Sequence, residues 1–319
     1  MASIKDIQRR IKSVKNTKKV TKAMEMVAAA KMRRAIESVL KTRTYANLSW
    51  ETVLNISKSA NGAAASHKLL AKRDEVKTVG IILITSNRGL CAGFNTNIIT
   101  KAHKSIEKHH KDGKKVEFIT IGKKGAGAKK YYGYDIVAEF PKEDIITEVK
   151  DVYDIAKLAI DDYVSGKYDK IMLAYTDYVN AVTQEPRVKQ LLPVEIDSED
   201  EYLGVVGEDS RVGTSKEMIE EKTEKHLSDD KYTFDYTFEP SPLEVLDEMI
   251  PRLIEVQLFQ ALLESNASEH SARMTAMHQA TDAASDMIDE LTLSYNKARQ
   301  EKITNEIAEI SAGANALQG

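Results

Sequence analysis

Helix-breaking residues are missing from both ends of this 319-residue chain. No Gly or Pro occurs in residues 1–61, and residues 242–312 contain no Gly and one internal Pro, Pro251. At about 1.5 Å of rise per residue, these spans predict helices of roughly 80 Å and 105 Å. A compact domain of this chain length is much narrower, so both helices are expected to project from a globular body.

Cysteine, net charge and long apolar runs are scarce as well. Cys91 is the single cysteine, which excludes an intrachain disulfide and fits a reducing compartment. The net charge of −3 provides no overall field for nucleic acid or a membrane surface. The longest strongly apolar stretch, residues 79–84, is far shorter than the ~20 residues of a membrane-spanning helix. The first residues also lack the apolar core of a signal peptide. We therefore expect a cytosolic chain without a direct membrane span, and attachment to a membrane through a partner stays open.

Both terminal segments repeat apolar residues at the spacing of a coiled coil. In the first segment the repeat consists of Ile4, Ile7, Ile11, Val14, Thr17, Thr21 and Met24. In the last segment, a three-four alternation runs through Leu246, Met249, Leu253, Val256, Gln260, Leu263, Ala267, His270, Met274, Met277, Thr281, Ala284, Ile288, Leu291, Tyr295 and Ala298. This period of 3.5 residues predicts a left-handed supercoil.

The second helix has recognisable start and stop residues. Ser241, Pro242 and Glu244 occupy the N-cap, first and third positions of a capping box. Pro251 is expected to bend the helix near its base, and Gly313 to end it.

The charges of the two segments favour their pairing. Residues 1–43 carry 13 Lys/Arg and three Asp/Glu, a balance of +10, whereas residues 241–319 carry five and 13, a balance of −8. Exposed ion pairs contribute only about 0–1 kcal/mol each, so they select the partner while burial of the seam provides the stability. We expect the helices to pack antiparallel if the middle domain lies at one end.

The middle of the chain alternates strand and helix patterns. Strands are predicted at residues 79–85, 116–121, 135–140, 169–175 and 188–194, with helices at 95–110, 126–132 and 147–165. The fold class is therefore α/β: a long antiparallel coiled coil plus a Rossmann-like middle domain with a mainly parallel sheet. The predicted segments are 1–61 (coiled-coil helix), 75–194 (α/β domain), 195–232 (acidic insertion) and 241–319 (coiled-coil helix).

Motifs that would carry chemistry are weak. Gly122 and Gly127 have the separation of a phosphate-binding loop, but Lys129 comes one place late. Gly89 and Gly93 fit a tight turn better than an anion site, and Cys91 fits a buried inert thiol better than a nucleophile. We expect no catalytic residues, no cofactor and no metal site.

The histidines lack partners at metal-ligand spacing. His103, His109 and His110 fit a solvated helix face, and His270, on the seam itself, fits a buried polar position that sets the register better than a ligand.

Two other functional classes stay open at this point. The first is a Rossmann-like enzyme with helical dimerisation arms, which would require a phosphate loop and acid–base residues at strand ends. The second is a nucleic-acid-binding coiled coil that uses the basic first helix. The basic residues overlap the apolar seam instead of preceding it, and an acidic helix is available in the same chain, so binding to nucleic acid is not expected.

Four motifs together resemble the gamma subunits of F-type ATP synthases. They are AMEMVAAAKMRRA (residues 23–35), NRGLCAGFN (87–95), SARMTAMHQATDAA (271–284) and YNKARQEKITNEIAEISAGA (295–314). The resemblance covers about nine-tenths of the chain, and the order of long helix, α/β domain and long helix agrees with it. In two positions the chain departs from the usual pattern, with Asn87 in place of Asp and Ala92 in place of Gly.

The resemblance implies a non-catalytic rotor shaft. In this family the coiled coil enters the hexamer of three alpha and three beta subunits, and the α/β domain lies near the epsilon subunit and the membrane c ring. Proton flow turns the ring and the shaft, which imposes different conformations on the three catalytic beta sites in turn. The implied location is peripheral, on the cytoplasmic side of a bacterial cell membrane. Small and mixed surfaces are expected near the far end of the shaft.

The resemblance also implies contact residues. Those expected at the rotor–beta contact are Met24, Arg33, Arg34, Arg273, Arg299, Gln300 and Thr304, with Lys31 nearby. Tyr236 and Glu239 are expected at the foot that meets the c ring and the epsilon subunit.

Overall fold

The computed structural model describes residues 4–59, 67–71, 73, 75–109, 115–144, 148–194, 239 and 241–318. The chain forms two compact units. Unit 1 combines Met1–Ala28 with Arg273–Gly319, and unit 2 comprises Ala29–Ala272. This division cuts both terminal helices, whereas the boundaries expected from the sequence follow segment ends and stay a prediction. The expected acidic insertion lies outside the described residues.

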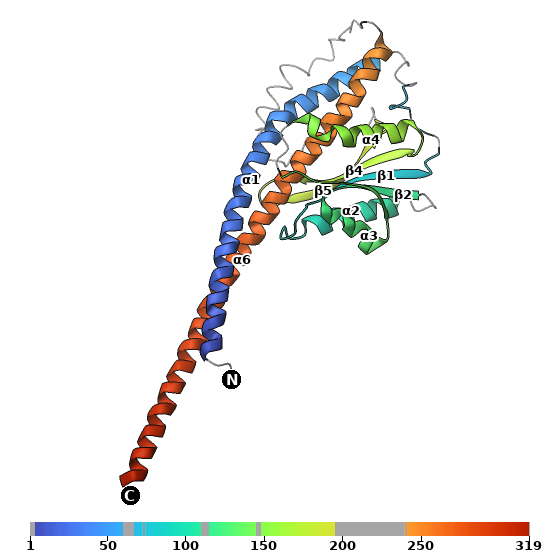
Figure 1. Cartoon of the computed structure of the whole chain (residues 1–319). Coiled ribbons are helices and arrows are strands. Elements are labelled where there is room, and N and C mark those ends of the chain that lie inside the picture. Colours follow the sequence, from blue (N-terminus) through green and yellow to red (C-terminus); the bar gives the residue numbers. More distant parts are fainter. Residues whose placement is uncertain are drawn as a thin grey trace. The chain divides into compact units, whose positions relative to one another are not determined.

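Unit 2 contains one five-stranded sheet in the order β3-β2-β1-β4-β5 (Figure 1). Its strands are β1 (Thr78–Ile84), β2 (Lys115–Ile121), β3 (Asp135–Phe140), β4 (Lys170–Tyr178) and β5 (Gln184–Leu192). Strands β1 to β4 run parallel, and β5 pairs antiparallel with β4. The mainly parallel sheet predicted from the sequence is thereby confirmed.

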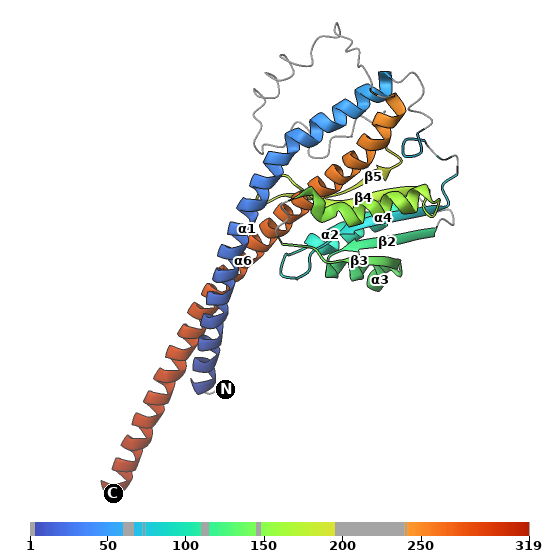
Figure 2. The same cartoon turned by 45° about the horizontal axis from the view of Figure 1, so that its top comes forward.

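Helices cover both faces of this sheet (Figure 2). The helical elements between the strands are α2 (Phe94–His109), η2 (Lys123–Ala126), α3 (Gly127–Tyr132), η3 (Val149–Val152) and α4 (Tyr153–Val164). Alternate residues of β1 divide between two cores: Ile81 and Leu83 pack with α2 and α3, while Ile82 and Ile84 pack with α4 and the last helix. Burial on both faces explains why β1 reads as a continuous apolar run.

The terminal helices are α1 (Ile4–Ser59) and α6 (Pro242–Gln318). The backbone N–H of Glu244 donates to the Ser241 hydroxyl at 3.3 Å, as the predicted cap requires. The predicted end at Gly313 is wrong, because α6 continues to Gln318. A Gly inside a helix costs only about 1 kcal/mol relative to Ala, which is too little to end a helix by itself.

In unit 1, α1 and α6 run antiparallel side by side (Figures 1 and 2). Gln8 Nε2 donates to the Tyr295 hydroxyl at 2.9 Å, and the hydroxyls of Thr281 and Thr21 lie 2.8 Å apart. Residue numbers rise along α1 as they fall along α6, which confirms the antiparallel pairing. In unit 2 the two helices are also in contact, since the Thr42 hydroxyl donates to Gln260 Oε1 at 2.8 Å.

One residue of the predicted α1 seam, Thr17, does not lie on it, whereas the other six predicted seam residues are buried or partly buried. Thr17 is exposed, and its hydroxyl donates to the backbone of its own helix. A strict three-four alternation instead places Lys18 and Glu25 on the partly buried seam. The prediction followed polarity, whereas packing follows the period of the supercoil. On α6, by contrast, none of the predicted seam residues is exposed.

Candidate functional site

A polar segment of α6 is buried on all sides in unit 2. Every residue from Leu258 to Ala272 is buried. The buried polar residues of this segment are Gln260, Glu264, Ser265, Asn266, Ser268, Glu269, His270 and Ser271. Such groups are costly to bury unless they are hydrogen-bonded, so their partners define the site.

Part of this segment completes the hydrogen bonding of β4. The pairing of β1 with β4 ends at Leu83 and Ala174, although β4 continues to Tyr178. The side chains of α6 take over there. The Thr176 N–H donates to Ser265 Oγ at 3.1 Å, the Ser268 hydroxyl donates to the Thr176 carbonyl at 3.2 Å, and the Tyr178 N–H donates to Glu264 Oε2 at 3.2 Å. Alternate residues of a strand direct their backbone groups to the same side, so one helix face satisfies both positions.

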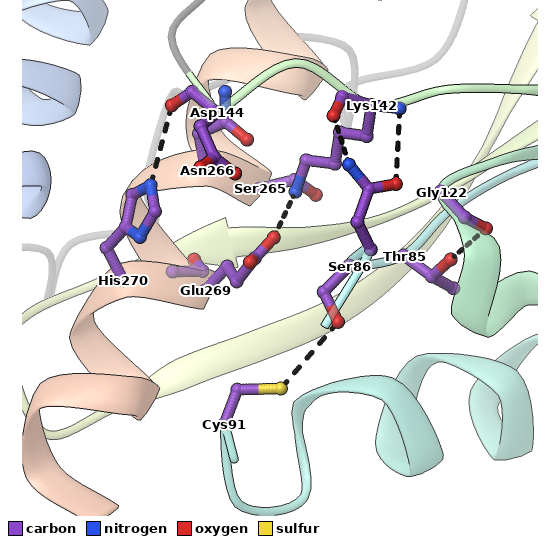
Figure 3. Close-up of polar contacts among 12 residues, drawn as sticks. Thr85, Ser86, Cys91, Gly122, Lys142, Asp144, Ser265, Asn266, Glu269 and His270 are labelled. Atoms are coloured by element: carbon purple, nitrogen blue, oxygen red, sulfur yellow. Dashed lines mark hydrogen bonds and ion pairs between the residues drawn. The ribbon is translucent and has the colours of Figure 1, made fainter. Parts of the chain in front are cut away.

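The segment that follows β3 holds a buried ion pair (Figure 3). Lys142 Nζ donates to Glu269 Oε2 at 2.8 Å, and only 2% of the Lys142 side chain and 6% of the Glu269 side chain are exposed. The ammonium also lies 5.5 Å from the centre of the Phe94 ring. Removing two charges from water is expensive, and this pairing offsets much of that cost.

Asn87, at the end of β1, holds the backbone of Lys142. Its Nδ2 donates to the Lys142 carbonyl, and its Oδ1 accepts from the Lys142 N–H at 3.4 Å. The same oxygen accepts from the Lys123 N–H at 3.4 Å. An ionised Asp has no hydrogen to donate to the carbonyl, so Asn matches this position better than Asp.

Two further residues extend these contacts to both long helices. Asp144 accepts from Lys31 of α1 at 2.5 Å, and this hydrogen bond lowers the pKa of Asp144 despite its partial burial. The backbone carbonyl of Asp144 lies 3.5 Å from His270 Nε2, and Asn266 Nδ2 donates to the Glu143 carbonyl at 3.4 Å. We call Lys142, Glu143 and Asp144 the 142–144 clasp.

The weak motifs have structural roles here. Cys91 is buried as predicted, with Asn95 Nδ2 at 3.2 Å from its sulfur. Gly122 has a φ of 99°, and a Cβ at this position would lie 2.3 Å from the Thr85 carbonyl oxygen. Close approach of two strand ends, and not phosphate binding, accounts for this glycine.

Two histidines can be compared with their predictions. His270 is buried, as expected of a seam position. His103 does not lie on a solvated face, because it stacks on Tyr132 at 3.9 Å and its Nδ1 lies 2.7 Å from the Tyr134 hydroxyl. His109 is a helix end residue whose side chain lies outside the described ones, as does all of His110.

The predicted contact residues divide between the two units. In unit 1, Met24 and Arg273 are partly buried, and Arg299, Gln300 and Thr304 are exposed. In unit 2, Arg33, Arg34 and Glu239 are exposed. Tyr236 lies outside the described residues.

The last described part of α6 is exposed to solvent, and we call residues 299–312 the bare end of α6. Every residue from Arg299 to Ala312 is exposed, and Ile303, Ile307 and Ile310 are 47%, 61% and 72% exposed on one helix face. The expectation of only small and mixed surfaces at this end is therefore wrong. The two views show α6 continuing past the first residues of α1, which explains the exposure.

The whole chain matches known proteins. The sequence model of the family described as ATP synthase matches residues 3–317. An ATP synthase gamma chain of Chloroflexus aurantiacus is 40% identical over 317 residues, covering 99% of each chain. This chain belongs to the ATP synthase gamma-chain family. Another gamma chain, from Herpetosiphon aurantiacus, is 42% identical over 322 residues and covers 99% of each chain.

Solved structures share the fold of this gamma-chain family member. A chain of the Euglena gracilis mitochondrial ATP synthase has a TM-score of 0.62 at 18% identity, covering 98% of this chain and 94% of that one. A chain from the Tetrahymena thermophila central stalk and c ring has a TM-score of 0.54 at 21% identity, covering 82% and 99%. Gamma chains are non-catalytic subunits, so neither the enzyme nor the nucleic-acid alternative is retained.

No helix in the described part of this gamma-family chain is long and apolar enough to cross a membrane. The buried polar segment of α6 was not predicted as a site. One local feature pointed to it: the stretch from Glu264 to Ser271 places Ser and Asn, which are poor helix formers, in the interior of a long helix.

Proposed function

We propose that this chain is the central shaft of a proton-translocating F-type ATP synthase. It transmits torque from the membrane c ring to the three catalytic beta subunits and so couples proton flow to ATP synthesis or hydrolysis. The full-length match to gamma chains is the observation that carries this proposal. The antiparallel pairing of α1 and α6 supports it, because a paired helix resists bending and twisting better than a single one.

The proposed partners are the alpha and beta subunits, the epsilon subunit and the c ring. The chain would act at the cytoplasmic side of a bacterial cell membrane, held there as a peripheral subunit. The neighbouring structures from Euglena and Tetrahymena come from mitochondrial assemblies that include a c ring, which supports the c ring as a partner.

The bare end of α6 is proposed to enter the alpha–beta hexamer. Arg299, Gln300 and Thr304 offer exposed polar groups, and the isoleucine stripe at 303, 307 and 310 offers an apolar face. Contiguous exposed apolar surface usually marks an interaction site. An apolar-lined sleeve is the kind of partner that this face fits.

The outward face of α1 is proposed as a second contact with beta. Met24 is partly buried, whereas its neighbours Met26 and Val27 are 59% and 57% exposed. We therefore assign the apolar part of this contact to Met26 and Val27, with Met24 supporting them. Arg33 and Arg34 are exposed and available to acidic beta loops, but Lys31 is already paired with Asp144.

Arg273 is proposed as a coupling position on α6, where its side chain is partly exposed. Tyr236 and Glu239 are proposed as the foot that meets the c ring and epsilon. For Glu239, exposure at the base of α6 supports this role.

Purification of the tagged chain from native membranes tests the proposed function. Recovery of the alpha, beta and epsilon subunits in fixed ratio with the chain is the expected result. A matched purification with the tag on an unrelated cytosolic protein controls for non-specific capture. Recovery of the chain alone would overturn the proposal. Recovery of the chain bound to nucleic acid that salt releases would overturn it as well.

A further inference from the structure

We propose that the 142–144 clasp is the joint through which the sheet of unit 2 delivers torque to both long helices, with Lys142 and Glu269 as positioning residues. This inference rests on the proposed shaft function and adds to it the residues that connect the sheet to the helices.

The clasp joins three parts of unit 2 within three residues. Asn87 ties it to the end of β1 through both backbone groups of Lys142. Glu269 ties it to α6, and Lys31 ties it to α1. Rotation of either helix against the sheet would displace one partner of one of these ion pairs.

Directional contacts are what such a joint requires. Apart from the hydrogen bonds of Glu264, Ser265 and Ser268 to β4, the interface between α6 and the sheet is largely apolar. Leu258 and Leu262 of α6 and Ile84 of β1 belong to this apolar part. Apolar burial stabilises without fixing direction, so it resists separation better than it resists rotation. A buried ion pair fixes both distance and angle, because its strength depends on alignment and on a low-dielectric surrounding.

The ion pair is not needed for stability alone. A buried pair can often be replaced by apolar residues of similar volume without loss of stability, whereas removal of one partner leaves an unpaired buried charge. Apolar residues would therefore stabilise this site as well as the Lys142–Glu269 pair does. The pair differs from them in fixing the position of α6 relative to the sheet. This difference makes the two roles separable by experiment.

The place of the clasp in the chain agrees with this role. Unit 2 begins at Ala29 and ends at Ala272. The clasp contacts Lys31 near the first of these residues, and Glu269 and His270 near the second. It therefore holds each helix close to the point in the sequence where that helix passes into unit 1.

The decisive variant is Lys142→Met together with Glu269→Leu, tested in the assembled ATP synthase complex. The matched control is Lys41→Met with Glu37→Leu, which removes a Lys–Glu pair that is exposed on α1. Four quantities are measured for each: the melting temperature, ATP hydrolysis, protons pumped per ATP hydrolysed, and the torsional stiffness of single rotors.

We expect the double variant to assemble, melt near the unchanged protein and hydrolyse ATP. The number of protons pumped per ATP hydrolysed and the torsional stiffness should each fall by about two-fold or more. We expect this loss because residues in contact are energetically coupled. The control should keep all four values. Asp144→Asn, which weakens only the tie to Lys31 at a half-exposed site, should lower stiffness in the same direction even if the double variant folds poorly.

Two different failures can be told apart. Assembly of the double variant and of Asp144→Asn with unchanged pumping ratio and stiffness would overturn the clasp proposal alone. Failure of the unchanged chain to assemble with alpha and beta subunits would overturn the proposed function and the clasp with it.

Discussion

Asp169 shows how one side chain fixes the start of a strand. Its Oδ2 accepts from the N–H groups of Thr78 and Lys77, each at 2.9 Å, and its Oδ1 accepts from Arg73 at 2.8 Å. Burial alone would raise the pKa of Asp169, but these three donors outweigh it and the pKa is lowered. The carboxylate therefore holds the first residues of β1 as long as it is ionised.

The lowered pKa predicts a loss of stability in acid. The folded-state pKa of Asp169 lies below its unfolded value, about 3.9 for a free Asp. The stabilisation is therefore present above about pH 4 and is lost as the pH falls through the folded-state pKa. Asp169→Asn should lower the free energy of unfolding at pH 7 by about 1–3 kcal/mol, because it leaves donors poorly paired.

Urea unfolding at pH 7 and at decreasing pH measures this effect. Asp286→Asn, at an exposed position of α6, is the control and should leave the unfolding free energy nearly unchanged. An Asp169→Asn protein as acid-sensitive as the unchanged protein would show that other carboxylates account for the acid loss.

The roles of some residues could be predicted from the sequence, and those of others could not. Burial of Cys91 was expected because no His and acid are arranged around it in the sequence, and burial of His270 because of its seam position. The role of Asn87 did not follow, because its partner Lys142 is 55 residues away. The reason for Gly122 also lies in another strand, at the Thr85 carbonyl.

At the scale of elements, a buried polar contact crosses the α1–α6 seam. The Thr281 hydroxyl lies 2.8 Å from the Thr21 hydroxyl and 2.8 Å from the Met277 carbonyl, and the Thr21 hydroxyl lies 3.1 Å from the Lys18 carbonyl. A shifted pairing would lose the contact between the two hydroxyls, so this polar seam position favours one register.

Thr281→Val should therefore lower the free energy of unfolding by about 1 kcal/mol, since it removes one partner of a buried pair. Replacing both threonines with Val should cost less than the sum of the single changes. Thr292→Val is the matched control: its hydroxyl donates to the Ile288 carbonyl at 2.7 Å, but the site is exposed. Thermal unfolding is measured for the unchanged protein, Thr281→Val, Thr21→Val, the double variant and the control. Strictly additive costs would contradict the contact.

Element types were predictable here, and so was the α1 seam except at Thr17. Both long helices and all five strands follow from breaker placement and period, which are local properties. Lys18 and Glu25 were passed over because they are charged, yet the period places them on the seam. Glu25 tolerates this position by pairing with Lys22 at 2.9 Å and with His278 at 3.4 Å.

At the scale of the whole molecule, the bare end of α6 is expected to contribute to function but not to stability. Residues 299–312 are exposed throughout, so they add little to the folded state of the isolated chain. Truncation after Ala298 should leave the melting temperature of the chain unchanged. Binding to the alpha–beta hexamer should weaken by about ten-fold or more, as expected when the central contacts of an interface are removed.

Truncation after Ala312 is the control, because it keeps the isoleucine stripe and the polar residues 299, 300 and 304. Proton-coupled ATP synthesis by the reconstituted complex is the functional measurement. Full synthesis by the chain truncated after Ala298 would contradict the proposed contact at this end.

The sequence by itself determined the rods, the α/β class and the family. Helix length, strand period and sequence motifs depend on residues that are close together in the sequence. They can therefore be predicted without knowing which distant residues are in contact. Tertiary structure alone decided which polar residues are buried and whom they meet. Lys142 and Glu269 lie 127 residues apart, and only the packing of α6 on the sheet brings them together. A charged residue is expected at the surface unless a partner for it is known. The partners in the clasp come together only in the folded chain, so the sequence did not predict it.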